Sequence, residues 1–352
     1  MAVVGVPLVI DGSHGEGGAS LVRTALALAS ITQQPMRIVN IRMDARKAGL
    51  STEDLLTLRT FASICGAQVI GGELGEKSLS FIPTRKPKGL NQELEFPADP
   101  DGGHANAIVV LNGLLPVLAK TGVYSTITCR GETYGNNVLS YDYFNNVTLC
   151  ALKKLGLYAY CDLATAGFGV GSRGEVSLEI EPSATQGVQW PDRGRLIAVR
   201  AVVVAGELPG EVAERGVKQL GRLAYYANLS VEAEAITVKS KTPGAYATVW
   251  AEFERGFGGA TAMGARGVRI EAVVQNAFEA FQEWLQTDAT VDPFLADQLL
   301  LSAALAEGET TFKISRLTQR FLTVAWVIKQ FIPLHITIKG QEGQPGTVTI
   351  RR

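Results

Sequence analysis

Histidine and cysteine are both scarce in this chain of 352 residues, which has three histidines and four cysteines. The cysteines lie far apart and form no C-x-x-C pair, so their spacing indicates neither a zinc ribbon nor a disulfide framework. Charge of neither sign is in excess, because Lys+Arg 33 and Asp+Glu 34 give a net charge of -1. A broad basic surface for nucleic acid is therefore excluded, and a polyanion would have to be bound locally.

Long hydrophobic runs are also missing. No stretch reaches the roughly 18 apolar residues that a membrane helix requires, and the N-terminus has no charged segment followed by an apolar run. Hydrophobic residues nevertheless make up 46% of the chain, which is typical of a folded protein with an apolar core. We expect a cytoplasmic protein with no membrane partner.

A helix-turn-strand pattern recurs three times along the chain, and each copy ends in arginine. The copies are Leu21–Arg42, Ala107–Arg130 and Leu295–Arg316. A second amphipathic helical pattern follows each copy, from Ser51, Ser140 and Leu317. Two strand patterns around a glycine-rich turn come next in all three cases. This order predicts three similar α/β units, each with helices packed on a sheet.

About 100 residues between the second and third copies do not fit the repeat. They contain alternating strand patterns and two long helical patterns. We therefore predict an α/β (α+β) fold with two domains. The large domain comprises the three repeated units in residues 1–185 and 288–352, and a smaller α/β domain is inserted at residues 186–287.

The segment that begins IDGSHGEGGASLVR has the layout of a strand end, a glycine-rich turn and a helix start. Its glycines allow backbone N–H groups to approach a ligand, and a helix N-terminus favours an anion. It lacks the G-K-[ST] of a P-loop. Glu16 in the turn suits a metal ligand or a hydrogen-bond acceptor beside a nucleotide, and Arg23 could bind a phosphate. A tight turn with solvated Glu16 and Arg23 is the alternative.

Several motifs together resemble the RNA 3'-terminal phosphate cyclase family. They include the opening segment Ile10–Arg42, KAGL at Lys47–Leu50, DRG at Asp192–Gly194 and LADQLLLSAALA at Leu295–Ala306. The resemblance covers nearly the whole chain and implies three repeated α/β units with a smaller inserted domain. It also implies ATP-dependent conversion of an RNA 3'-phosphate to a 2',3'-cyclic phosphate through a covalent histidine–AMP. The expected partners are ATP and an RNA 3' end, with Mg or Mn as the divalent metal, and a homodimer is left open.

The resemblance also assigns roles to individual residues. Glu16 resembles the family's metal-associated glutamate, and Phe294 stands where the family has a tyrosine that flanks the nucleotide. Asp297 and Gln298 resemble a nucleotide-contacting pair. The predicted nucleotide-binding residues are Glu16, Arg23, Phe294, Asp297 and Gln298, and the predicted residues for RNA or phosphate are Arg42, His104 and Arg320.

One departure from the family pattern concerns the nucleophile. The family's histidine lies in a pattern like S-x-H-x-x-T-N, and the corresponding run TQRFLTV has Arg320 at the histidine position while Thr323 is kept. A guanidinium has a pKa above about 12 and no free lone pair, so Arg320 is not expected to be a nucleophile. A Gln-His pair of the family is replaced by Glu53 and Asp54, which brings negative charge toward a site for phosphates.

The other histidines are weak substitutes for the lost nucleophile. His104 lies in a glycine-flanked loop and is either a phosphate ligand or a surface residue. His335 alternates within a strand pattern, which indicates a structural or solvated position. His14 stands beside Glu16, at a position where the family is variable.

Three hypotheses for the function remain open. The first is an ATP-dependent RNA 3'-phosphate cyclase, or a related nucleotidyl-transfer enzyme, with an altered nucleophile. The second is a non-catalytic RNA-binding or ribosome-biogenesis type of protein on the same scaffold, in which Arg320 is a fixed cation for a phosphate. The third is a site for a small anionic metabolite, by analogy with enolpyruvyl transferases, which rests on the fold alone.

Overall fold

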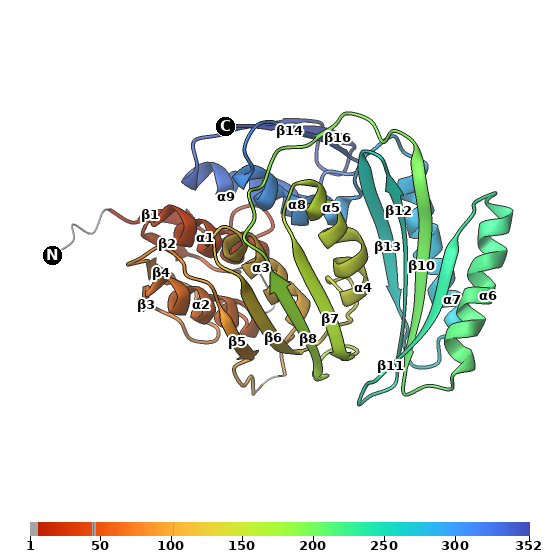
Figure 1. Cartoon of the computed structure of the whole chain (residues 1–352). Helices are drawn as coiled ribbons and strands as arrows, with labels where there is room; N and C mark the ends of the chain where they lie inside the picture. The colour runs from red at the N-terminus through yellow and green to blue at the C-terminus, as the bar shows by residue number, and fades with distance from the viewer. Residues whose placement is uncertain (1–5, 44, 46, 101) are drawn as a thin grey trace.

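The computed structural model describes residues 6–43, 45, 47–100 and 102–352, and it has the predicted mixed α/β architecture. Figure 1 shows three sheets around a group of helices, with a fourth sheet and two long helices beside them. The first unit comprises β1 (Leu8–Asp11), α1 (Ala19–Thr32), β2 (Met36–Val39), α2 (Thr52–Cys65), β3 (Gln68–Ile70) and β4 (Leu79–Ile82).

The second and third units repeat this order. The second comprises β5 (Asn91–Glu95), α3 (Ala107–Ala119), β6 (Ser125–Gly131), α4 (Tyr141–Tyr143), the π-helix η1 (Phe144–Thr148), α5 (Leu149–Lys154), β7 (Ala159–Thr165) and β8 (Gly174–Ile180). The third comprises β9 (Gln189–Trp190), α8 (Pro293–Leu305), β14 (Thr310–Ile314), α9 (Gln319–Phe331), β15 (His335–Lys339) and β16 (Gly346–Arg351). In the second unit the single predicted helix is therefore three consecutive segments with a π turn in the middle.

The three sheets share one topology. Their strand orders are β1-β2-β4-β3, β5-β6-β8-β7 and β9-β14-β16-β15. In each sheet the first two strands are parallel and the other pairs are antiparallel. Each unit thus begins with a strand that the sequence repeat did not include. The strand β9 belongs to the third unit although it lies within residues 186–287.

The helices of the units pack against one another in the middle of the molecule. The helix α1 contacts α2, α3 and α9, and α8 contacts α3 and α9. Their apolar faces form one continuous core with the inner faces of the three sheets, as expected for helices that are apolar on most sides. The N-terminal turns of helices from all three units meet at one place.

Residues between β9 and α8 form the smaller part of the molecule. Its elements are β10 (Leu196–Gly206), α6 (Glu211–Tyr226), β11 (Glu232–Val238), β12 (Gly244–Phe253), β13 (Gly256–Met263) and α7 (Ile270–Leu285). The sheet order is β11-β10-β12-β13, and α6 and α7 cover one face over a separate apolar core. The boundaries at residues 186 and 287 stay a prediction.

Arg193 ties the two ends of this smaller part together. Its guanidinium donates hydrogen bonds to the carbonyl oxygens of Trp284 (2.8 Å), Leu285 (2.8 Å) and Ala289 (2.5 Å) at and beyond the C-terminus of α7. It also lies over the Trp284 ring, 4.4 Å from the centroid. Burial lowers the pKa of Arg193 to about 10, so the group stays charged at neutral pH. A cation at this position satisfies carbonyls that the helix itself leaves unpaired.

None of the helices in the described part of the chain is both long enough and apolar enough to cross a membrane.

Candidate functional site

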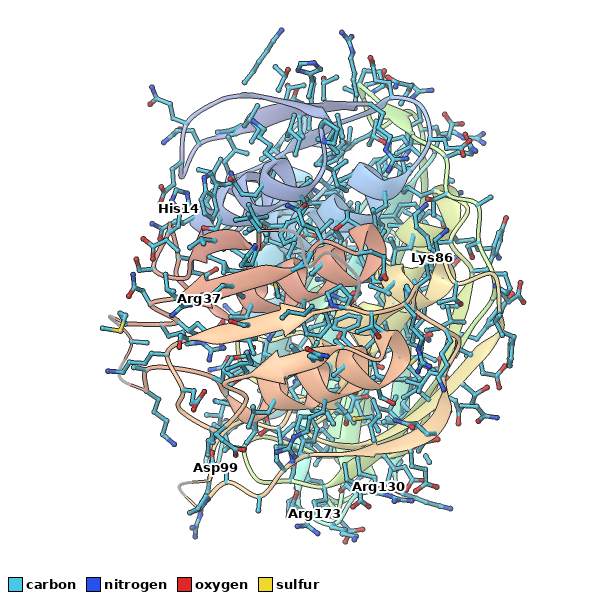
Figure 2. All side chains as sticks on the ribbon, turned by 90° about the vertical axis from the view of Figure 1, so that its left-hand side faces the viewer. His14, Arg37, Lys86, Asp99, Arg130 and Arg173 are labelled. Carbon is cyan, nitrogen blue, oxygen red and sulfur yellow. The ribbon has the colours of Figure 1, made fainter. Side chains whose placement is uncertain are left out.

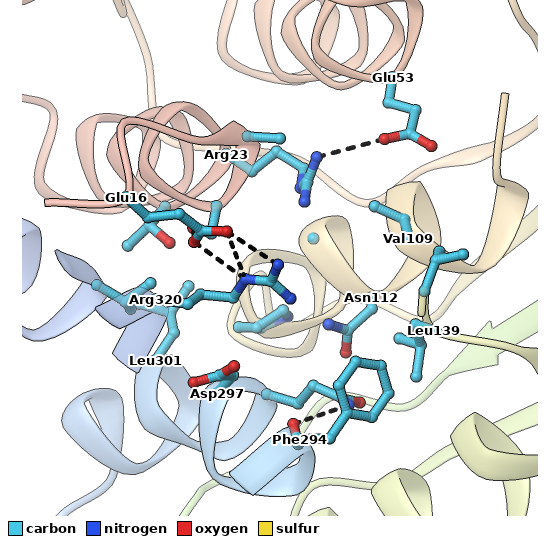
Figure 3. A pocket seen from close by; sticks show the side chains of 18 of the residues that line it. Glu16, Arg23, Glu53, Val109, Asn112, Leu139, Phe294, Asp297, Leu301 and Arg320 are labelled. Atoms are coloured by element: carbon cyan, nitrogen blue, oxygen red, sulfur yellow. Dashed lines mark hydrogen bonds and ion pairs between the residues drawn. The ribbon is translucent and has the colours of Figure 1, made fainter. Parts of the chain in front are cut away.

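A cavity of about 280 Å³ lies where helices of all three units converge (Figure 3). Side chains from α1, α2, α3, α8 and α9 line it, most of them from the first two turns of their helices. Of the predicted residues, Glu16, Arg23, Phe294, Asp297, Gln298 and Arg320 all line this cavity. The fold thus brings together in one cavity six predicted residues, and their positions in the chain are up to 304 residues apart.

Capping side chains fix where three of these helices begin. Asp292 accepts hydrogen bonds from the backbone N–H groups of Phe294 (2.8 Å) and Leu295 (3.0 Å) at the start of α8. Thr318 accepts from the N–H of Phe321 at the start of α9, and Asn106 caps α3 in the same way. Such caps satisfy donors that the helix leaves free. The positive helix ends then face the cavity and favour negative charge there.

The glycine-rich turn before α1 fits closely against α9. Gly15 has φ +61°, a left-handed conformation, and a Cβ atom there would collide with Oγ1 of Thr323. That hydroxyl accepts a hydrogen bond from the N–H of Glu16 at 3.0 Å and donates to the carbonyl of Gln319 at 2.8 Å. Gly15 and Thr323 together therefore hold the Glu16 backbone next to the first turn of α9.

Glu16 and Arg320 form a bidentate ion pair at the cavity wall. The Nε and Nη2 atoms of Arg320 donate to both carboxylate oxygens of Glu16 at 3.0–3.3 Å. The hydrogen bonds to Glu16 raise the pKa of Arg320 above its already high value. Arg320 is therefore a permanent cation with no basic nitrogen, in the position that the resemblance gives to a nucleophilic histidine.

A second group of charges lies on the α1 and α2 side of the cavity. Nη1 of Arg23 is 3.7 Å from Oε2 of Glu53 and 3.6 Å from Oδ1 of Asp54. Asp54 is fully buried, and its other oxygen lies 2.6 Å from Nη2 of Arg42. Burial lowers the pKa of Arg23 and raises that of Glu53. Arg23 and Arg42, two of the three arginines that were predicted to bind phosphate, are thus paired with carboxylates of α2.

The α8 side of the cavity presents the predicted nucleotide-contacting residues. Asp297 accepts a hydrogen bond from Oγ1 of Thr318 at 2.8 Å, and burial raises its pKa to about 7. The Gln298 amide accepts from Thr148 at 2.5 Å and donates to the Phe294 carbonyl at 3.0 Å. The amide of Gln298 is therefore occupied by structural bonds, whereas Asp297 can change protonation state near neutral pH.

Phe294 separates the first cavity from a larger one. The ring packs edge to face against Tyr143, with ring centroids 5.1 Å apart. The neighbouring cavity of about 510 Å³ shares Phe294 and Arg320 and extends to Gly259 and Trp284 of the smaller part. The second cavity is a cleft between the third unit and β13 and α7 of the smaller part, and the Phe294 ring borders both cavities. Such a ring suits contact with a nucleobase.

Arg42 and His104 lie in a different cavity, of about 680 Å³. Its other lining residues come from the loops around Gly49 and Gly103, and Glu53 lines both this cavity and the first one. Nδ1 of His104 is 3.2 Å from the buried carboxylate of Glu132. Two of the three residues predicted to contact RNA or phosphate, Arg42 and His104, are thus adjacent to the first cavity but do not line it, whereas Arg320 does.

All three histidines are in the described part of the chain, and none lines the first cavity. Figure 2 shows His14 at the border between the first and third units, where its ring stacks on Trp326 of α9 at 3.9 Å. His335 is exposed on β15. No imidazole is therefore available as a nucleophile among the residues that line this cavity.

Two polar residues at the site were not predicted from the sequence. Asn112 lines the cavity from α3, and Thr318 orients Asp297 while it caps α9. Asn112 is the only polar side chain in the apolar run AIVVLNGLLPVLA, and this contrast is a signal that could have identified it. Thr318 has no comparable signal, because its contact with Asp297 exists only in the folded chain.

The site does not fit a resident divalent metal ion. Both oxygens of Glu16, the predicted metal ligand, accept hydrogen bonds from Arg320. Within the described residues, no group of three or more His, Cys, Asp or Glu side chains could hold a metal. Mg²⁺ is commonly held by one or two carboxylates together with substrate phosphates, so a Mg or Mn ion that arrives with a nucleotide stays a prediction.

Comparisons with known proteins agree with the architecture and the motifs. The family model described as RNA 3'-terminal phosphate cyclase matches residues 14–338. A protein of Gloeothece citriformis named RNA 3'-terminal phosphate cyclase is 35% identical over 326 residues, which cover 92% of this chain and 93% of that protein. Proteins of the same name from Methylococcus capsulatus and Pyrococcus furiosus are 33% and 31% identical, and each alignment covers at least 96% of both chains. The chain belongs to the RNA 3'-terminal phosphate cyclase family.

Proposed function

We propose that the protein binds the 3' end of RNA in the cavity between the helix N-termini and does not form a covalent histidine–AMP there. One observation carries this proposal: Arg320, paired with Glu16, stands at the first turn of α9, and no histidine lines the cavity. An arginine has no lone pair for attack on phosphorus. It is well suited to a permanent electrostatic contact.

The shape and chemistry of the cleft support an RNA end as the ligand. Phe294 offers a flat apolar surface beside the cavity, and the capped starts of α3, α8 and α9 direct backbone dipoles into it. The chain has a net charge of -1, so contact should be local and involve few phosphates. Binding should therefore weaken only modestly as salt rises, with a shallow slope.

ATP-dependent cyclisation without a protein–AMP intermediate is the second candidate, and Asp297 favours it. In that reaction the RNA 3'-phosphate would attack the α-phosphorus of ATP and release pyrophosphate. The neighbouring 2'-hydroxyl would then displace AMP and pass its proton to Asp297. A carboxyl with a pKa of about 7 is a suitable proton acceptor at neutral pH. The name that the relatives carry supports the same candidate.

Incubation with α-labelled ATP and 3'-phosphorylated RNA distinguishes the two candidates, because only the second forms a cyclic end and releases AMP. Denaturing separation of the protein shows in addition whether AMP is covalently bound to it. We expect no labelled protein from the wild type or from Arg320→Lys, which keeps the charge. Capture of AMP by Arg320→His alone would indicate that the nucleotide pocket is intact and only the nucleophile is lost. Labelled wild type, or a cyclic end formed from 3'-phosphorylated RNA, would refute the binding-only proposal.

RNA binding needs its own measurement. Fluorescence anisotropy with a labelled linear oligonucleotide and its circularised form tests whether an end is recognised. We expect the linear RNA to bind more tightly. Equal affinity of the two forms, or no binding at low salt, would contradict recognition of a 3' end.

A further inference from the structure

Arg316 is an arginine of the second cavity that has no carboxylate partner. It lies between β14 and α9, and its side chain is exposed. It also lines a smaller cavity of about 340 Å³, which it shares with Phe294 and Arg320. Within the described part of the chain, its guanidinium forms no ion pair and no hydrogen bond. An exposed cation without an internal partner is available to a ligand.

The arginines that line the first cavity differ from Arg316, because carboxylates neutralise them. Arg320 forms the bidentate pair with Glu16 that Figure 3 shows. Arg23 lies 3.7 Å from the carboxylate of Glu53. A phosphate at either of these arginines would compete with a carboxylate for the same cation, whereas a phosphate at Arg316 meets no such competition.

The backbone on both sides of Arg316 is fixed. Directly before it, β14 is paired with β16. Directly after it, Leu317 is buried, its N–H donates to the carbonyl of Gln344, and its carbonyl accepts from the N–H of Gly343, both at 2.8 Å. Thr318 then caps α9. Arg316 therefore projects from a segment that is held at both ends, so a ligand has only its side chain to order.

The carboxylates around Arg316 are bonded to other groups or lie on the far side of the second cavity. Glu16 and Asp297, which line the smaller cavity, both accept hydrogen bonds from neighbouring side chains. Asp292 is buried and accepts four hydrogen bonds. Glu283 belongs to α7 and forms no ion pair with Arg316. Among the described residues, no carboxylate therefore neutralises Arg316.

We propose that Arg316 binds the phosphate of a 3'-phosphorylated RNA end and is the residue through which the protein selects that end over a 3'-hydroxyl. This inference rests on the proposed binding of an RNA 3' end. A phosphomonoester carries up to two negative charges and three acceptor oxygens, and the planar guanidinium can bind two of these oxygens at once. The hydroxyl of Ser315, which lines the second cavity and has no hydrogen bond within the described residues, can donate a further bond.

The selection should be moderate in size because Arg316 is exposed. Water and salt weaken an exposed charge pair, whereas bidentate geometry strengthens it. The phosphodiesters along an RNA can also contact the protein, but they are the same in RNAs that differ only at the 3' end. The ratio of the two affinities therefore reports on the terminal group alone, and Arg316 is a specificity-determining residue.

The test measures how tightly the full chain binds RNAs of one sequence by fluorescence anisotropy, with an internal label and without ATP. One RNA has a 3'-phosphate, one has a 3'-hydroxyl, and one has a 3'-hydroxyl and a 5'-phosphate, so that its charge matches the first. The wild type should bind the 3'-phosphate form at least about fivefold more tightly than either of the others, which is about 1 kcal/mol.

The variants assign this preference to one side chain. Arg316→Gln should remove most of the preference, and Arg316→Lys, which keeps the charge and loses the planar fork, should give an intermediate ratio. Arg222→Gln on α6 removes an exposed positive charge away from these cavities and should leave the ratio unchanged. Thermal unfolding checks that each variant is folded, as expected for changes of exposed side chains.

The outcomes separate this inference from the proposed function. Equal wild-type binding of the three RNAs, or a ratio that Arg316→Gln does not change, would overturn the inference and leave RNA binding intact. An equal effect of Arg222→Gln would also overturn it, because the preference would then follow net charge. Calorimetric titration with ATP covers the other source of phosphate. Weaker ATP binding by Arg316→Gln, with the RNA ratio unchanged, would assign Arg316 to a nucleotide instead. No binding of any RNA at low salt would overturn both proposals.

Discussion

The contact between Gly15 and Thr323 gives the most direct test of how the site is built. Gly15→Ala introduces two separate costs. The left-handed backbone at φ +61° disfavours any side chain by roughly 1–2 kcal/mol. The added methyl group also overlaps Oγ1 of Thr323, which two hydrogen bonds hold in place, and such overpacking costs roughly 1–3 kcal/mol.

We therefore expect Gly15→Ala to lower the free energy of unfolding by roughly 2–5 kcal/mol. Guanidinium unfolding followed by tryptophan fluorescence measures it, because Trp326 lies one turn from Thr323. Gly122→Ala is the matched control, since Gly122 has φ +74° and open space around a Cβ, so only the backbone cost of roughly 1–2 kcal/mol applies. In the double variant Gly15→Ala/Thr323→Ala, the hydroxyl that overlaps the new methyl group is absent, so most of the free energy lost through overpacking should be regained. Equal losses for Gly15→Ala and Gly122→Ala would refute the reasoning.

Two further predictions concern the charges of the cavity. The pKa of Asp297 is about 7 in the folded chain against 3.8 for an ordinary Asp, so the folded state keeps a proton that the unfolded chain releases between these values. The stabilisation is full at low pH and is lost as pH rises through about 7, so the stability of the wild type should fall relative to Asp297→Asn over this range. Guanidinium unfolding of both proteins at several pH values measures this difference, and parallel pH profiles would contradict it. Glu16→Gln should change the free energy of unfolding by less than about 1 kcal/mol, because the pair with Arg320 is partly exposed. It should also increase the affinity for inorganic phosphate in calorimetric titration, because Arg320 loses its counter-charge, and an unchanged affinity would be evidence against this role of the pair.

Most of the fold could be predicted from the sequence because the repeated pattern is carried by apolar periodicity. The helices α1, α3 and α8 and the strands that follow them lie within a few residues of the three recognised copies. The strand β9 was not recognised because it has only two residues, and the predicted insertion at residues 186–287 included it. The strand β13 has little strand signal in the sequence, because GFGGATAM is rich in glycine and alanine, which have low strand propensity.

The site was predicted as a set of residues but not as an arrangement of charges. Glu16 and Asp297, both singled out by motif resemblance, line one cavity because Glu16 lies in the turn before α1 and Asp297 lies in the second turn of α8. Asp54 of α2 neutralises the charges of Arg23 and Arg42 because it is buried between them. The sequence alone does not show how deeply a residue is buried. The separation of His104 from the main cavity has the same origin, since loop position is set by packing between units.

The position of Arg193 bears on the order in which the chain can fold during synthesis. Its partners on α7 emerge from the ribosome about 90 residues later, roughly 5–20 s at ordinary elongation rates. Once this contact forms, the smaller part can be complete while α8 and β14 are still being made. The strand β9 is then held close to the C-terminal end of the smaller part, from which the chain continues to α8 and β14. The strands β9 and β14 of the third unit are then connected through a folded smaller part whose two ends are close together, and not through a long flexible loop. The entropy cost of forming the parallel β9–β14 pair is therefore lower.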